Sequence, residues 1–205
     1  SNLQSVGDNL SEISNFNTAE DNKALREVSR GLRRDSPCKK TVKIYANLVD
    51  DVGLFAKNRY LTRCNDIIQS FTIIVADPHM LQDFDKQKNL EIVKCVLDTL
   101  KKGGLSNLTS LNIKNLQVGP GGAKEIANAI EKGGLSKLTS LDISGNDIGP
   151  GGAMEIANAI KDGGLRNLTS LDISDNWIEV GGAKEIANAI ESGNLRNLTS
   201  LNISG

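Results

Sequence analysis

Residues able to do catalytic chemistry are few in this chain. Its one histidine, His79, has no cysteine or acidic partner at a catalytic or metal-binding spacing. The three cysteines, Cys38, Cys64 and Cys95, lack a zinc-binding spacing, and two lie in apolar stripes, which is typical of buried thiols in a reducing compartment. The glycine-rich residues 119–124 lack the G-x-x-x-x-G-K-S/T spacing of a phosphate-binding loop. We therefore expect no catalytic site, no metal and no cofactor, and a protein that is not an enzyme.

Net charge and the distribution of apolar residues indicate which classes of partner the chain does not bind. The 205 residues carry a net charge of −1 and have a pI of about 5.9, whereas a nucleic-acid binder usually carries a basic surface. There is no apolar run long enough to cross a membrane. We expect a cytoplasmic protein that binds neither nucleic acid nor membrane.

The second half of the chain is a tandem repeat. Three full copies of a thirty-residue pattern occupy residues 103–132, 133–162 and 163–192, and a truncated fourth occupies residues 193–205. A fixed period of this length indicates a stacked repeat architecture. Because the fourth copy lacks its second half, we expect the chain to be a fragment. Its last strand would then be an open edge, able to self-associate by pairing with another chain.

Each repeat combines two periodicities. In the second copy, Leu141 and Ile143 flank a polar residue, which predicts a short strand with one buried face. Ala153, Ile156 and Ile160 then follow at helical spacing. Parallel strands stack about 4.8 Å apart while helices need about 8–10 Å. Stacked repeats should therefore curve, with the strands on the concave side.

The repeat resembles a known family. The pattern L-x-x-L-x-L/I-x-x-N-x-I spans residues 138–148 and 168–178 and is similar to the leucine-rich repeat of the ribonuclease-inhibitor-like subfamily. The resemblance implies an α/β fold, a right-handed solenoid with concave parallel strands and convex helices. It also implies an asparagine ladder in which Asn146 and Asn176 bond the backbone of the neighbouring turn. Leu116 replaces the asparagine of the first repeat, so we expect a different turn there.

The first half of the chain lacks the repeat. Residues 1–17 are polar, and we expect them to be disordered. Apolar stripes over residues 42–55 and 61–75 predict helices, with no strand before Leu111. We expect residues 18–87 to form an all-α N-terminal cap bundle. The repeat array would then occupy residues 88–205 and begin with a divergent helix at residues 90–102.

The concave face is the best candidate for a binding surface. The residues next to the buried strand positions should form polar rows across the repeats, in which Asp142 and Asp172 are neighbours. Such a surface is either a solvated polar face or an acidic stripe that takes a basic segment of a partner. The candidate residues on this surface are Asn112, Lys114, Asp142, Asp172, Asp175 and Asn202.

The single tryptophan is a separate candidate. Trp177 occupies the repeat position held by Asp147 and Gln117, so the core does not require it. An exposed tryptophan on a loop is a plausible binding hot spot. The alternative is local packing against Val180.

Two functions follow from these patterns. The first is a protein–protein interaction module that binds a protein partner through the concave face and adjacent loops. The second is a targeting arm of a larger effector, whose ubiquitin-ligase adaptor or GTPase-regulating activity lies in the helical region or in further sequence. A third interpretation is a spacer that sets length. Bacterial effector and symbiont proteins use similar repeats for host targets, and a chain of that class would be delivered into a host cell.

Overall fold

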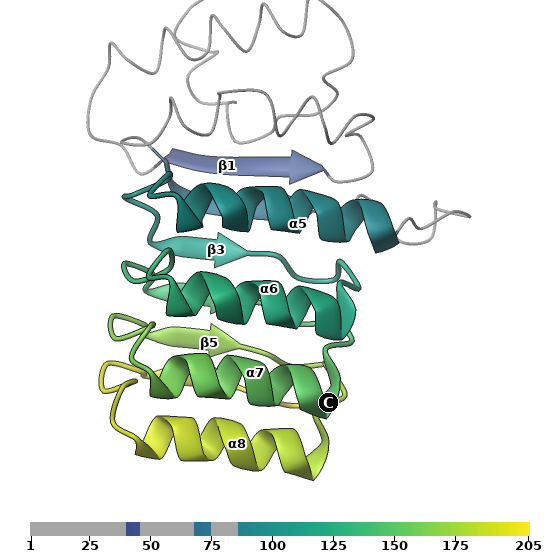
Figure 1. Ribbon diagram of the computed structural model, residues 1–205, viewed down its shortest axis with the longest axis vertical. Coiled ribbons are helices and arrows are strands. Elements are labelled where there is room, and N and C mark those ends of the chain that lie inside the picture. Colours follow the sequence, from purple (N-terminus) through teal and green to yellow (C-terminus); the bar gives the residue numbers. More distant parts are fainter. Residues whose placement is uncertain (1–39, 46–67, 75–85) are drawn as a thin grey trace, which may run out of the picture.

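The structure, a computed structural model, describes residues 40–45, 68–74 and 86–205 of the chain (Figure 1). Within these residues the first two elements are strands, and helices and strands then alternate. The strands are β1 (Lys40–Tyr45), β2 (Ile68–Ile74), β3 (Ser110–Asn112), β4 (Ser140–Asp142), β5 (Ser170–Asp172) and β6 (Ser200–Asn202). The helices are α5 (Lys86–Lys101), α6 (Gly119–Glu131), α7 (Gly149–Lys161) and α8 (Glu179–Glu191).

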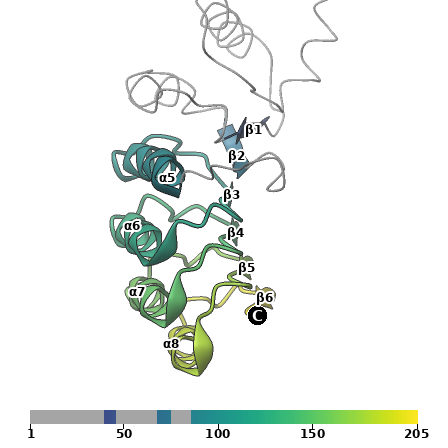
Figure 2. The same cartoon turned by 90° about the vertical axis from the view of Figure 1, so that its right-hand side faces the viewer.

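The strands form one parallel sheet in the order of the chain, from β1 to β6. Leu111 pairs with Leu141, and Leu141 pairs with Leu171, at a constant register. Figure 2 shows the strands in one layer and helices α5 to α8 in a second. The prediction that the tandem repeats stack as an α/β solenoid, with one strand and one helix per repeat, is therefore confirmed.

The core lies between the two layers and is built from the apolar positions of each repeat. In the second copy, Leu141 and Ile143 of the strand half and Ala153, Ile156 and Ile160 of the helix are at most 1% exposed. Each buried leucine or isoleucine contributes about 1.5–3 kcal/mol relative to an exposed one. The helical stripe predicted from the 3.6-residue period is confirmed.

Glycine sets how closely the helices approach. A Cβ added to Gly152 at the start of α7 would lie 2.7 Å from the Cβ of Ala123 on α6. A Cβ added to Gly182 on α8 would lie 2.9 Å from the Cβ of Ala153. The Gly-Gly-Ala sequence in each repeat therefore lets successive helices pack with almost no side chain between them.

Two strands correct the prediction for the first half of the chain. Residues 40–45 and 68–74 form β1 and β2, and β2 pairs with β3 through Phe71 and Leu111. The prediction of helices there, and of no strand before Leu111, was wrong. Both segments are rich in β-branched residues, and short apolar runs cannot be assigned to helix or strand from periodicity alone. The expected disorder of residues 1–17 and the remainder of the expected bundle lie outside the described residues.

The turn of the first repeat also differs from expectation. Asn115 and Gln117 have φ values of 57° and 51°, and the corresponding Gly145 and Asp147 have 65° and 56°. The turn therefore keeps the left-handed conformations of its counterpart, although Leu116 replaces asparagine. Leu116 is fully buried, so an apolar side chain fills the same interior position.

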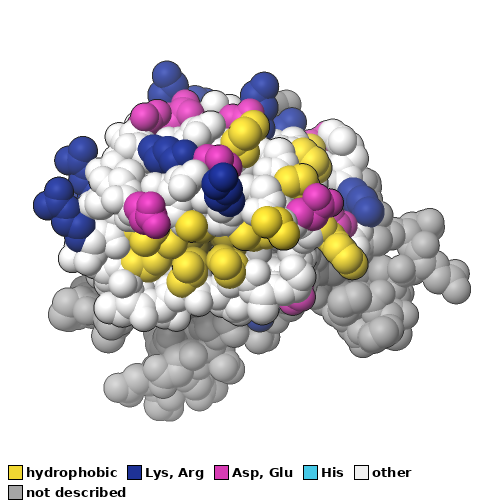
Figure 3. Space-filling model, turned by 90° about the horizontal axis from the view of Figure 1, so that it is seen from below, with side chains coloured by type: hydrophobic (Ala, Val, Ile, Leu, Met, Phe, Trp, Pro, Cys, Tyr) yellow, Lys and Arg dark blue, Asp and Glu magenta, His cyan; other side chains and the backbone are white. Residues whose placement is uncertain are grey.

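The α8 end of the array presents the apolar positions that are covered in earlier repeats. Leu201 and Ile203 are 40% and 38% exposed, whereas Leu171 and Ile173 are each 1% exposed. Figure 3 views the molecule from this end and shows apolar side chains in a band across it. In the structure described, β6 is the outermost strand on this side of the sheet.

Candidate interaction surface

The concave face carries one polar row across the repeats. Asn112 pairs in register with Asp142, Asp142 with Asp172, and Asp172 with Asn202. In β3, β4 and β5 the central leucine is buried, so Asn112, Asp142 and Asp172 lie on the opposite face of the sheet. Asn202 continues the row in register on β6. The structure therefore brings together four of the candidate residues.

The outer amides of this row bond its inner carboxylates. Asn112 Nδ2 donates to Asp142 Oδ2 at 2.9 Å, and Asn202 Nδ2 donates to Asp172 Oδ2 at 3.1 Å. Within the described repeats, no ion pair or hydrogen bond joins Asp142 to Asp172 or neutralises either one. The two carboxylates lie on adjacent strands, where like charges repel by about 1 kcal/mol in water.

A serine two residues downstream fixes each carboxylate. Ser144 donates to Asp142 Oδ1 from its backbone N–H at 3.1 Å and from its hydroxyl at 2.7 Å. Ser174 donates to Asp172 Oδ1 in the same way, at 3.0 Å and 2.6 Å. The two negative charges are thus held in defined positions before any partner binds, which reduces the entropy lost on binding.

The hydrogen bonds favour the ionised form of Asp172. Partial burial acts to raise its pKa, but the bonds from Ser174 and Asn202 and the charge of Lys114 outweigh that effect. The pKa of Asp172 is therefore below its usual value. Lys114 is exposed and makes no ion pair within the described residues, so its ammonium is available to a partner.

The turn after β5 carries the remaining two candidates. Asp175 and Trp177 have φ values of 52° and 53°, in the left-handed region. Trp177 is 73% exposed and Val180 is 86% exposed. The two side chains therefore do not bury one another, and the indole of Trp177 lies on the surface.

This turn also departs from the repeat at two further positions. Glu179 has a φ of 55° where the second repeat has Gly149 at 66°, and Val180 replaces Pro150. A left-handed conformation costs a non-glycine residue on the order of 1 kcal/mol, and proline is favoured in the first helical turn. Sequence reasoning missed Glu179 as a surface residue, although comparison of the repeats shows that it replaces a glycine.

The asparagine ladder joins successive turns. Asn146 Oδ1 accepts from the N–H of Leu116 at 3.1 Å, and its Nδ2 donates to the carbonyls of Ile113 and Ile143 at 2.9 and 2.8 Å. Asn176 Oδ1 accepts from the N–H of Asn146 at 2.9 Å. Both asparagines are at most 1% exposed. They satisfy backbone groups that the turn would otherwise leave unpaired in the interior.

Two further sets of hydrogen bonds were not predicted. Asn89 on α5 is buried and donates to the carbonyl of Leu116 at 3.0 Å, and nothing in the repeat pattern indicates this contact. Thr139 Oγ1 donates to the carbonyl of Thr109 at 3.0 Å, and Thr169 Oγ1 donates to that of Thr139 at 2.8 Å. The thirty-residue recurrence of threonine was the signal that could have revealed this ladder.

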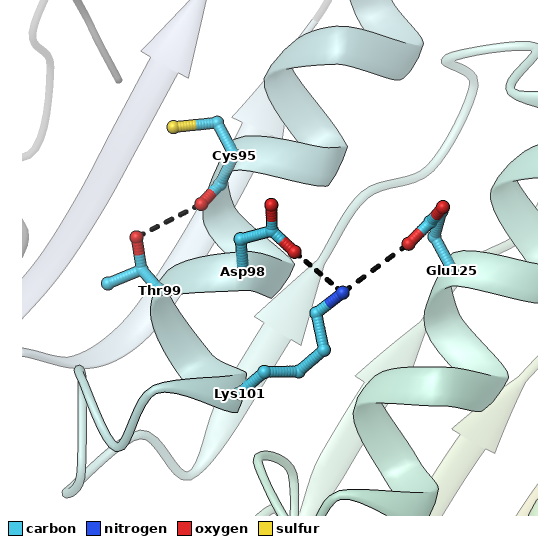
Figure 4. A network of polar contacts seen from close by, with 5 residues as sticks. All are labelled: Cys95, Asp98, Thr99, Lys101 and Glu125. Atoms are coloured by element: carbon cyan, nitrogen blue, oxygen red, sulfur yellow. Dashed lines mark hydrogen bonds and ion pairs between the residues drawn. The ribbon is translucent and has the colours of Figure 1, made fainter. Parts of the chain in front are cut away.

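Polar contacts near α5 are structural. Lys101 Nζ lies 2.6 Å from an oxygen of Asp98 and 3.4 Å from one of Glu125 on α6 (Figure 4). Thr99 Oγ1 donates to the backbone carbonyl of Cys95 at 3.0 Å. Burial, assisted by the charge of Asp98, raises the pKa of the Cys95 thiol. The thiol therefore stays protonated at neutral pH and is a weak nucleophile.

The described residues present neither a metal-binding cluster nor a membrane-spanning helix. Among the described residues, no group of three histidine, cysteine or acidic side chains is arranged to hold a metal ion. No helix in the described segments is long and apolar enough to span a membrane.

A parallel sheet that gains one strand per repeat, backed by one helix per repeat, defines a solenoid repeat protein. The Leucine Rich repeat family matches residues 134–157 and 164–187, within the second and third copies. The second and third copies are thus leucine-rich repeats. A comparison with curated proteins gave no match.

Proposed function

We propose that the chain is a protein-interaction module that binds a protein partner through the concave face of its repeat array and the adjoining turns. The binding residues would be Asn112, Lys114, Asp142, Asp172, Asp175, Trp177 and Asn202. The ribonuclease-inhibitor-like subfamily assignment is part of this proposal, and the regular 13-residue helix of each full repeat supports it.

The paired carboxylates are the observation that carries the proposal. Asp142 and Asp172 are adjacent in register, held by hydrogen bonds and not neutralised within the described repeats. A basic group from a partner would relieve their mutual repulsion and keep every existing hydrogen bond. Fixed charges that complement those of a partner increase the specificity and the rate of association.

The test compares charge reversal on the two faces of the array. The variant Asp142→Lys with Asp172→Lys is expected to lower capture of the partner at least tenfold, measured by quantitative mass spectrometry of proteins retained on the immobilised chain. The matched control is Glu155→Lys with Asp162→Lys, which changes two exposed carboxylates on the helix side. Equal capture by both variants, each with an unchanged circular dichroism spectrum, would show that the concave face is not the binding surface.

Self-association through β6 is a second part of the proposal. The exposed Leu201 and Ile203 support it, as does the position of β6 at the edge of the described sheet. An unpaired strand edge presents backbone donors and acceptors to another chain.

A further inference from the structure

The turn before α8 differs from its two counterparts without benefit to the fold. Trp177, Glu179 and Val180 stand where the first repeat has Gln117, Gly119 and Pro120. Trp177 and Glu179 still adopt φ values of 53° and 55°, which bulky side chains disfavour. None of the three substitutions fills the core, because all three side chains are exposed.

The repeat positions of Trp177 and Val180 are also exposed in the middle of the array. Asp147 and Pro150 occupy the corresponding places in the second repeat, which has a repeat stacked on either side. Both are nevertheless exposed. Exposure at these two repeat positions therefore does not require an uncovered end of the array.

Three carboxylates belong to the same two turns as the exposed indole. Asp175 and Glu179 lie two residues before and after Trp177, and Asp147 holds the equivalent position in the adjacent turn. The two turns are joined by bonds from Gly145 N–H to the Ser174 carbonyl at 3.0 Å and from Gly149 N–H to the Asn176 carbonyl at 2.9 Å.

These charges are also unpaired. Asp147, Asp175 and Glu179 are all exposed, and none makes an ion pair within the part of the chain that the structure describes. The two joined turns therefore present an exposed aromatic ring and three exposed carboxylates on neighbouring stretches of backbone.

We propose that the turn patch, defined as Asp147, Asp175, Trp177, Glu179 and Val180, docks a basic segment of the protein partner with an arginine over the indole. A guanidinium stacks on a tryptophan face and bonds carboxylates at the same time. Its aliphatic stem can contact an apolar side chain such as Val180. This inference rests on the proposed function and names the chemistry of the partner.

The one tryptophan of the chain provides the readout. The probe is the capped peptide Arg-Gly-Arg-Gly-Arg, titrated into the 205-residue chain while the emission of Trp177 is recorded. We expect a saturable change that weakens as salt is raised, and none with the Glu-Gly-Glu-Gly-Glu peptide. No saturable change with the arginine peptide, or equal affinity for the glutamate peptide, would overturn the inference.

Charge removal tests the role of the carboxylates. The variant Asp147→Asn, Asp175→Asn and Glu179→Gln keeps the indole and is expected to weaken arginine-peptide binding at least fivefold. The matched control, Glu131→Gln, Glu155→Gln and Asp162→Asn, removes three exposed carboxylates from the helix side and is expected to leave affinity unchanged. Equal weakening by both sets would mean that general charge, and not the turn patch, attracts the peptide.

A second variant returns the turn to residues that the chain already uses. Trp177→Gln, Glu179→Gly and Val180→Pro copy the first repeat, so folding should be preserved, with no drop in melting temperature. Binding of a fluorescein-labelled arginine peptide, measured by anisotropy, should be lost, and unchanged binding contradicts the inference. If the peptide fails to bind the native chain while partner capture still depends on Asp142 and Asp172, the inference fails and the proposed function stands.

Discussion

Lys161 on α7 lies 2.8 Å from Glu185 on α8, and this ion pair joins successive helices on the convex side. Lys101 and Glu125 make the equivalent contact between α5 and α6 at 3.4 Å. Between α6 and α7 the corresponding residues are Glu131 and Glu155, both exposed. That pair of helices therefore carries like charges where its neighbours carry an ion pair.

The variant Glu131→Lys is expected to stabilise the chain. It replaces a repulsion with an attraction, and exposed ion pairs contribute about 0.2–1 kcal/mol. We expect the free energy of unfolding, measured in urea, to rise by about 0.5 kcal/mol at low salt and by less in 1 M NaCl. Glu131→Gln, which only removes the repulsion, is the control. A gain from lysine no larger than that from glutamine would contradict the proposed pairing.

Removal of a ladder asparagine is expected to be costly. Asn146→Ala leaves the buried N–H of Leu116 and the carbonyl of Ile113 without their side-chain partner. Each unsatisfied buried group costs about 1–3 kcal/mol, so we expect a loss of about 3 kcal/mol in urea unfolding. Asn158→Ala, on the exposed side of α7, should change stability by less than about 0.5 kcal/mol. A loss below about 1 kcal/mol for Asn146→Ala would show that water replaces the ladder.

Repetition made the solenoid and its register predictable. Leu111, Leu141 and Leu171 recur every thirty residues, so the pairing of one strand determines that of the others. β1 and β2 occur before the repeat and have no second copy to define their period. Their apolar residues fitted a helical stripe as well as a strand, and pairing of β1 with β2 and of β2 with β3 decides between the two.

The site was only partly predictable for a different reason. The row from Asn112 to Asn202 follows directly from strand alternation. The conformation of the turns does not, because the value of φ at Trp177 or Glu179 depends on the stacked backbone and not on residue preference. Leu116 shows the same effect, since it adopts the turn of its neighbours without their asparagine.

Acid is expected to remove the contribution of Asp172. Its pKa is lowered in the folded chain, so its stabilising effect is complete above the unfolded pKa of about 3.9 and is lost as pH falls through the folded pKa. Asp172→Asn should therefore lower the free energy of unfolding by less than about 1 kcal/mol at pH 7, because the group is largely solvated. The difference from the native chain should shrink at pH 3. If the difference in free energy of unfolding between Asp172→Asn and the native chain instead grows on acidification, the predicted pH dependence is wrong. Asp162→Asn, at an exposed helix end, is the control.

Relief of the strained turn is expected to stabilise the third repeat. Glu179→Gly removes a left-handed conformation that costs about 1–2 kcal/mol and adds unfolded-state entropy worth about 0.4–1 kcal/mol. We therefore expect a net gain of about 0.5 kcal/mol in urea unfolding. Glu191→Gly, in the last turn of α8, should instead lower stability, since glycine is a poor helix former. A loss from both variants would show that Glu179 makes a stabilising contact that offsets its backbone strain.

Self-association of the 205-residue chain should depend on β6. Leu201→Lys places a charge on the edge strand, where it disfavours pairing with a second copy. The variant is expected to lower the dimer fraction in sedimentation velocity at about 100 µM, a concentration at which a contact of about −5.5 kcal/mol is half populated. Met154→Lys is the matched control, because Met154 lies on helix α7 and not in the sheet, and its exposed fraction of 46% is similar to the 40% of Leu201. A native chain that stays monomeric throughout, or dimers that both substitutions weaken equally, would contradict association through this edge.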